Sequence, residues 1–232
     1  MKLLAFDTST ELLSVAVQSG DPAARPPLCH SGPGAAQASA TLIPVIQALL
    51  SQAGLRAGEL DAIVFGQGPG SFTGLRTACA VAQGLAFPGG VPVLAVETLM
   101  AVAQDAHSRR GGAQMVAVLD ARMDEVYWAA YELQGGRWLR RGEIQLGRPE
   151  SVHVPAGFVV AGNTRIVYGD RLPGGAPSVD AMPTSLALLQ LAPALLAAGL
   201  AGPPAAALPL YIRDKVAQTT QERQALAQPK SA

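Results

Sequence analysis

The chain alternates between apolar runs of strand length and longer stretches whose apolar positions recur at helical spacing. Near its start, residues 2–6 and 12–18 predict two strands joined by the polar turn "DTSTE", a pattern typical of a hairpin. Further strands are expected around Leu28 and at 60–65 and 91–96. Helical spacing predicts helices at 39–53, 71–87 and 97–106. This order of elements indicates an α/β lobe with a mixed sheet.

The second half repeats the theme, again with a hairpin first. The predicted strands are 115–119, 125–133, 138–146 and 157–161, and an Ala/Leu-rich helix interrupted by Pro193 is predicted over 184–200. We therefore expect a duplicated architecture with a cleft between its halves. The predicted division is a first lobe at 1–110, a second lobe at 111–215 and a polar tail at 216–232.

Composition limits the classes of function. Hydrophobic residues make up 49% of the chain, and its 17 basic and 17 acidic residues cancel, so the charge balance is not that of an autonomous nucleic-acid binder. Cys29 and Cys79 stand far apart and outside any CxxC pattern, which predicts neither a disulfide framework nor a zinc site. The start is too short in apolar residues for a signal peptide, and no run reaches membrane-spanning length. We expect a cytoplasmic protein that does not enter membranes.

The stretch "GQGPGSFTGLR", residues 66–76, is dense in glycine and follows a predicted buried strand. Its spacing does not match a phosphate-binding P-loop, a dinucleotide fingerprint or the G-x-S-x-G nucleophile turn. Ser71, Asp120 and His153 do occur in an order that hydrolase triads use, but no motif accompanies them.

The stretch therefore predicts a tight turn in which Ser71 or Thr73 caps the helix that follows. That helix is rich in small residues and apolar on nearly every side, which indicates burial on every side. Either it packs wholly inside its own lobe, or a helix of another chain covers its outward side. For the second alternative, the predicted interface comprises Ser71, Phe72, Gly74, Leu75, Ala78, Val81, Ala82, Leu85, Leu42 and Ile46.

Five segments carry a family resemblance: "LAFDTST", "GQGPGSFTGLR", "AVETLM", "LDARMDEVYWAAY" and "YIRD". In this order, across residues 1–215, they resemble the TsaB (YeaZ-type) subunits of the bacterial tRNA threonylcarbamoyladenosine biosynthesis complex, which are related to the glycoprotease-like TsaD proteins. The resemblance implies the actin/Hsp70/sugar-kinase-like fold of two ribonuclease H-like lobes, with mixed sheets flanked by helices.

The resemblance also implies a role. It is that of a non-catalytic dimerisation or activating subunit that scaffolds the paralogous transferase TsaD as a heterodimer, alongside the ATPase TsaE. ATP, a metal ion and most tRNA contact would then belong to the partners, and the chain alone could form a homodimer. The alternative is a stand-alone enzyme, either a glycoprotease-like peptidase or a phosphotransferase of the same fold class.

The residues themselves favour the non-catalytic role. The helix that holds an H-x-x-x-H metal motif in TsaD-like subunits reads "AAQASATLIPVIQ" here, without histidine. Where nucleotide-binding members have a small Asp-Gly turn, this chain has Asp120-Ala121-Arg122, whose side chains hamper the approach of a phosphate. We therefore assign no catalytic residue and no metal ligand. Weak candidates for holding a phosphate or water are Asp7, Thr8 and Ser9.

Charged residues are most concentrated near the start of the segment "LDARMDEVYWAAY". Asp120, Arg122, Asp124 and Glu125 form a polar cluster that is either a solvated strand end or a contact across the cleft or to a partner. The arginines of the following hairpin, Arg140 and Arg141 among them, indicate a solvated face, with contact to tRNA phosphates as the alternative.

Overall fold

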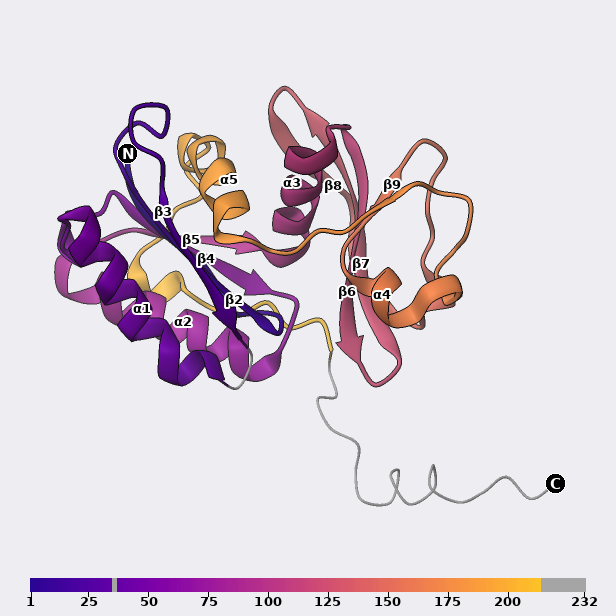
Figure 1. Ribbon diagram of the computed structural model, residues 1–232, viewed down its shortest axis with the longest axis horizontal. Coiled ribbons are helices and arrows are strands. Elements are labelled where there is room, and N and C mark those ends of the chain that lie inside the picture. Colours follow the sequence, from indigo (N-terminus) through magenta and orange to yellow (C-terminus); the bar gives the residue numbers. More distant parts are fainter. Residues whose placement is uncertain (35–36, 214–232) are drawn as a thin grey trace, which may run out of the picture.

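The computed structural model describes residues 1–34 and 37–213, so the predicted polar tail lies outside the described residues. Two five-stranded sheets stand side by side with helices between and around them (Figure 1). The strands of the first sheet are β1 (Lys2–Asp7), β2 (Leu12–Ser19), β3 (Leu28–Pro33), β4 (Ala62–Gly68) and β5 (Val93–Glu97). Those of the second are β6 (Gln114–Arg122), β7 (Glu125–Gln134), β8 (Arg137–Gly147), β9 (Val159–Ala161) and β10 (Ser178–Val179).

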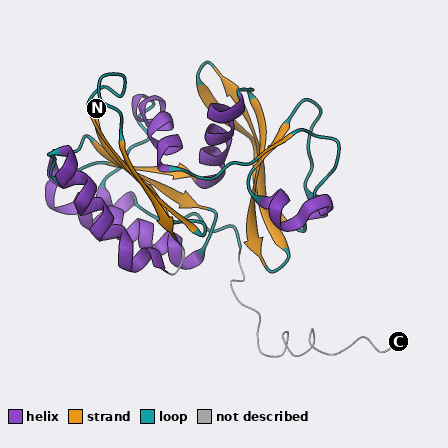
Figure 2. Ribbon diagram, in the orientation of Figure 1, coloured by secondary structure: helices purple, strands orange, loops and turns teal. Residues whose placement is uncertain are grey.

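The helices form layers against these sheets (Figure 2). They are α1 (Ala38–Ala53), α2 (Phe72–Ala86), α3 (Thr98–Arg110), α4 (Thr164–Tyr168) and α5 (Ser185–Ala197). Helices α1 and α2 cover one face of the first sheet, and α3 and α5 lie between that sheet and the second. The short α4 lies on the far side of the second sheet. Within the described residues, no helix combines the length and apolar content needed to span a membrane.

The two sheets have the same topology. The first runs in the order β3-β2-β1-β4-β5 and the second in the equivalent order β8-β7-β6-β9-β10. In each, the first three strands in sequence are antiparallel and the last two join in parallel. This duplication confirms the predicted α/β fold of two related lobes.

The central strands are buried on both faces. In β1, Leu3 and Ala5 point into the core shared with α3 and α5, whereas Leu4 and Phe6 point into the core under α1 and α2. Successive residues of a strand face opposite sides, so a strand with cores on both sides needs apolar residues at every position. This is why β1 and β4 read as unbroken apolar runs in the sequence.

Helix α5 departs from the predicted division of the chain. It lies within 111–215, but it packs on β1, β2 and β4 of the first sheet. The Ser185 N–H donates to Ser14 Oγ on β2 at 2.9 Å, and Gly202 exchanges two backbone hydrogen bonds with Val93 on β5. The first sheet ends with β5 and the second begins with β6, whereas the end of the described chain returns to the first lobe.

Candidate functional site

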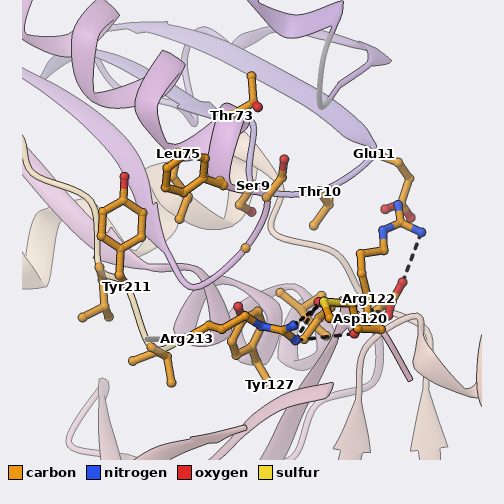
Figure 3. Close-up of a pocket in the computed structure, with 18 of the residues that line it drawn as sticks. Ser9, Thr10, Glu11, Thr73, Leu75, Asp120, Arg122, Tyr127, Tyr211 and Arg213 are labelled. Carbon is orange, nitrogen blue, oxygen red and sulfur yellow. Dashed lines mark hydrogen bonds and ion pairs between the residues drawn. The ribbon is translucent and has the colours of Figure 1, made fainter. Parts of the chain in front are cut away.

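A cleft of about 320 Å³ opens where the equivalent hairpin turns of the two lobes face each other (Figure 3). One wall is the turn after β1 with the N-terminal end of α2, and the other is the turn between β6 and β7. A C-terminal segment at 210–213 closes one side. The polar and aromatic residues that line the cleft are Ser9, Thr10, Glu11, Ser71, Phe72, Thr73, Asp120, Arg122, Tyr127, Asn163, Tyr211 and Arg213.

The weak phosphate candidates are bonded within the chain. Asp7 and Thr8 are fully buried, and Ser9 is the one of the three that lines the cleft. The N–H and Oγ of Ser9 donate to Asp7 Oδ1 at 2.8 and 2.6 Å, and Thr8 Oγ1 donates to the Gly74 carbonyl at 2.8 Å. These side chains therefore brace the turn against α2, with their donors already in use.

Asp7 retains one unsatisfied group. Its Oδ2 is buried and has no hydrogen-bond partner among the described residues. Burial raises the pKa of the Asp7 carboxyl to about 6, against the lowering effect of the Ser9 hydrogen bonds. The charged form of Asp7 is thus unfavourable in the folded chain.

The glycine-rich stretch is closely approached by its own chain. A Cβ at Gly74 would overlap the Thr8 carbonyl oxygen, and a Cβ at Gly70 would lie 2.5 Å from the Ser9 carbonyl oxygen. Gly68 has a φ of +121°, and a Cβ there would lie 2.6 Å from the Leu210 oxygen. The glycines therefore let the β1–β2 turn and the C-terminal segment pack against the start of α2. Ser71 is the predicted N-cap, accepting from the Gly74 N–H.

The predicted interface needs correction, because most of its residues lie in the chain's own core. Ser71, Phe72, Val81 and Leu85 are partly exposed. The others are buried: Leu42, Ile46, Ala78 and Ala82 lie in the core between α1, α2 and the first sheet. Gly74 lies against the β1–β2 turn, and Leu75 lies at the cleft. Small residues on this inner side let α2 lie close to the sheet. Helical spacing alone could not tell which apolar side of α2 faces the sheet.

The opposite side of the two helices is exposed and almost uncharged. Arg76 is the only charged residue in either helix. We define the outer α1–α2 face as the exposed residues of these helices, which are mostly small or amide-bearing: Ser39, Ala40, Thr41, Ile43, Pro44, Gln47, Ala48, Ser51 and Gln52 of α1, and Thr73, Arg76, Ala80 and Gly84 of α2.

The predicted polar cluster is brought together at the β6–β7 turn. Arg122, Met123 and Asp124 have φ of 60°, 56° and 62°, in the left-handed region that costs a non-glycine residue of order 1 kcal/mol each. Arg122 pairs with Asp120 at 3.2 Å within the turn.

Two arginines from distant segments complete the cluster. Arg171 pairs with both Asp124 and Glu150, and Arg213 pairs with Glu125 at 2.6 Å. The pKa of Asp124 is lowered, chiefly by its hydrogen bond from Arg171. The sequence gives no sign of Arg171 as a member of this cluster, because 47 residues separate it from Asp124. Arg213 stands in the "YIRD" segment, but nothing in its spacing indicated Glu125 as its partner.

The cleft does not assemble a catalytic triad. Ser71 and Asp120 line it, but His153 is exposed and does not. Asp120 Oδ1 accepts from Tyr168 Oη at 2.7 Å. The described part of the chain contains no group of three or more His, Cys, Asp or Glu side chains that could hold a metal ion.

The hairpin arginines are engaged with acids. Arg140 pairs with Glu97 at 2.8 Å, and Tyr131 donates to the other oxygen of Glu97 at 2.7 Å. Arg141 pairs with Glu132. This face therefore carries balanced charge, and the Glu97 contacts also join the end of β5 to the second sheet.

The chain is similar to known proteins along most of its length. A family model described as "TsaD: tRNA N6-adenosine threonylcarbamoyltransferase" matches residues 34–163, more than half of the chain. The chain is 38% identical over 155 residues to "tRNA threonylcarbamoyladenosine biosynthesis protein TsaB" of Escherichia coli (strain K12), covering 66% of this chain and 65% of that protein. It is 41% identical over 130 residues to the protein of the same name from Haemophilus influenzae, covering 56% and 53%.

These matches span less than two thirds of the length of the two curated relatives. A solved structure described as YeaZ from Pseudomonas aeruginosa is matched more completely. It superposes with a TM-score of 0.82 at 41% identity, covering 91% of this chain and 99% of that chain.

Proposed function

The chain belongs to the TsaD family and, within it, to the TsaB (YeaZ) group, and on this premise we propose that it is a non-catalytic subunit in the biosynthesis of threonylcarbamoyladenosine in tRNA. Its role is to dimerise with the TsaD transferase and to activate it. The ATPase TsaE joins the assembly, and ATP and the metal ion bind to these partners. tRNA is contacted through the complex, which acts in the cytoplasm.

The outer α1–α2 face is the observation that carries this proposal. Charged residues make up 15% of this chain, against about a quarter in a typical domain, so two helices of 16 and 15 residues would carry about five charges even at this chain's own frequency, yet these carry one. Exposed helix faces are normally polar and charged, whereas the centres of protein interfaces are depleted in charge. Small side chains also permit a close approach of two helices. Helices α1 and α2 therefore fit a partner with a matching pair of helices.

The cleft supports the non-catalytic part of the proposal. Ala121, Arg122 and Met123 place side chains at the turn where nucleotide-binding relatives would have the small Asp-Gly turn. The donors of Thr8 and Ser9 are taken up by the chain's own acceptors. Catalysis is accordingly assigned to TsaD.

A single charge on the outer face tests the proposal. Ala80 is exposed on α2, so Ala80→Arg leaves the core intact but places an unpaired cation in the interface. We expect TsaD to bind at least about 100-fold more weakly in isothermal titration, and tRNA modification by the reconstituted complex to fall in parallel. The matched control is Leu139→Arg, at a residue 41% exposed on β8. Equal TsaD affinity for Ala80→Arg and Leu139→Arg would refute this docking face.

A further inference from the structure

We propose that residues 207–213, here called the C-terminal clasp, hold the strained turn 122–124 in place and tie it to the N-terminal end of α2, so that partner docking on α2 and the shape of the cleft are coupled. The coupling to a partner rests on the function proposed above. The clasp itself rests only on contacts within the chain.

The clasp is fixed to the first lobe through its backbone. Leu210 N–H donates to the Gln67 carbonyl at 2.7 Å, and Gln83 Nε2 donates to the Ala207 carbonyl at 2.9 Å. The Leu210 carbonyl packs on Gly68, where any side chain would collide with it. These contacts give the segment one conformation along the side of α2.

Tyr211 connects the clasp to the outer face. Its hydroxyl accepts a hydrogen bond from Arg76 Nε at 3.0 Å, and its ring centroid lies 5.5 Å from that of Phe72. The Arg76 guanidinium lies 3.9 Å from the Phe72 ring centroid. Arg76 is the charged residue of the outer α1–α2 face, so a partner on that face contacts a side chain that is bonded to the clasp.

Arg213 connects the clasp to the second lobe. Its side chain is only 12% exposed, and its Nη2 donates to Glu125 Oε2 at 2.6 Å and to the Ala121 carbonyl at 3.1 Å. Its Nη1 donates to Met123 Sδ at 2.8 Å. Arg213 thus contacts residues on both sides of the turn and within it.

The turn requires such support. A two-residue hairpin of this type needs positive φ at both central positions and favours Asn-Gly, but here it is Met123-Asp124, preceded by Arg122 also at positive φ. Strained residues persist only where the surrounding structure determines them. Arg171 holds Asp124 from the second lobe, and Arg213 holds the side that faces the cleft. A contact on α2 therefore reaches the turn through Arg76, Tyr211 and Arg213, and coupling of this kind acts equally in both directions.

Hydrogen exchange of the isolated chain tests the clasp directly. Arg213 lies at the end of the described chain. Arg213→Ala therefore removes the contacts to the turn 122–124 without leaving a cavity in a hydrophobic core. We expect the amides of residues 119–127 to exchange at least about 10-fold faster than in the wild type. The matched control is Arg137→Ala, an exposed arginine at the other end of the same sheet. Unchanged exchange in Arg213→Ala, or the same increase in the control, would overturn the proposal.

A second variant separates support of the turn from general loosening. Arg122→Gly relieves the strain at a position of positive φ and keeps the backbone carbonyl that Arg213 contacts, so adding Arg213→Ala to it should accelerate exchange by less than half the factor seen in the wild-type background. If the two changes multiply independently, the clasp does not act on turn strain.

Titration with TsaD tests the coupling. We expect Arg213→Ala to weaken binding about 3- to 10-fold although Arg213 lies outside the outer face. If exchange rises but affinity stays at the level of Arg137→Ala, the coupling to the partner is wrong. The Ala80→Arg result decides the docking face separately, because failure of that variant to weaken binding leaves the exchange experiment on the clasp unaffected.

Discussion

The two sides of α2 use small residues for opposite purposes. On the inner side, Gly74, Ala78 and Ala82 are fully covered, and the backbone of the β1–β2 turn lies directly against Gly74. On the outer side, Ala80 and Gly84 are exposed, and a Cβ at Gly84 would meet nothing within 4 Å. Small residues inside allow the chain to approach itself, whereas small residues outside leave a smooth surface that nothing in the described chain covers.

The difference shows why composition does not identify an interface. Both sides of α2 are apolar and slim, so a residue count treats them alike. Their exposure, together with the near absence of charge outside, separates a packing surface from the docking surface that we propose.

A matched pair of glycine substitutions gives the sharpest contrast. Gly74→Ala places a Cβ against the Thr8 carbonyl, a backbone group that cannot move aside, and we expect it to cost about 4 kcal/mol of unfolding free energy. Gly84→Ala, on the exposed side of the same helix, should stabilise the chain by about 0.5–1 kcal/mol because alanine has the higher helix propensity. Urea denaturation measures both. Similar values for the two variants would remove the distinction between the sides of α2.

The buried carboxyl of Asp7 should make the free energy of unfolding depend on pH. The pKa of Asp7 is raised by burial to about 6 in the fold, from the ordinary 3.8 of an aspartate carboxyl, so the folded state binds the proton more tightly than the unfolded state. Stability is therefore gained as pH falls from above 6 to below about 4, and the charged form costs about 3 kcal/mol above pH 6. Asp7→Asn should abolish this dependence of the unfolding free energy on pH.

The measurement is the unfolding free energy of wild type and Asp7→Asn from pH 4 to pH 7. We expect the variant to match the wild type near pH 4 and to exceed it by up to about 3 kcal/mol at pH 7. A gap that stays constant over this range would show that the Asp7 carboxyl is not buried as described.

On the outer side, the uncharged surface predicts association of the chain with itself when no partner is present. Ile43, which is 43% exposed on α1, should lie in that contact. Ile43→Arg is expected to weaken dimerisation by about 30-fold, or about 2 kcal/mol, in sedimentation equilibrium. Leu186→Arg, at a similarly exposed leucine of α5, serves as the control. A wild type that remains monomeric at high concentration would confine the role of this face to other partners.

The smallest effect is expected on a surface that is already suited to water. On β8, Glu143 pairs with Arg140 at 3.5 Å with 84% of its side chain exposed. Such a pair contributes little, so Glu143→Ala should change the unfolding free energy by less than about 0.5 kcal/mol and leave TsaD affinity unchanged. A clear loss of affinity would extend the docking surface to the second lobe.

Much of the fold could be predicted from the sequence because its signals are local. The buried strands β1 and β4 read as apolar runs, and Ser71 before α2 marks a helix start. In both halves a hairpin comes first, and this repeated order indicates two lobes of the same topology. The short β10 and α4 could not be predicted, because two and five residues are too few to show a strand or helix periodicity.

The candidate site was predicted less well because it depends on distant contacts. The polar cluster at 120–125 was identified from its charge, but its partners Arg171 and Arg213 come from far along the chain. For α2, a helix apolar on all sides gives no sign of which side meets the sheet. Only the tertiary contacts show that Ala78 lies inside and Ala80 outside.

The return of α5 to the first sheet has a consequence for biosynthesis. Domains are generally completed in the order in which the ribosome delivers them, but here the face of the first sheet opposite α1 and α2 is covered only in part, by α3, until residues 185–197 have been translated. The lobe that begins first is therefore finished last. A nascent chain stalled after β6 would leave Leu3 of β1 and Ala16 of β2 without the cover of α5.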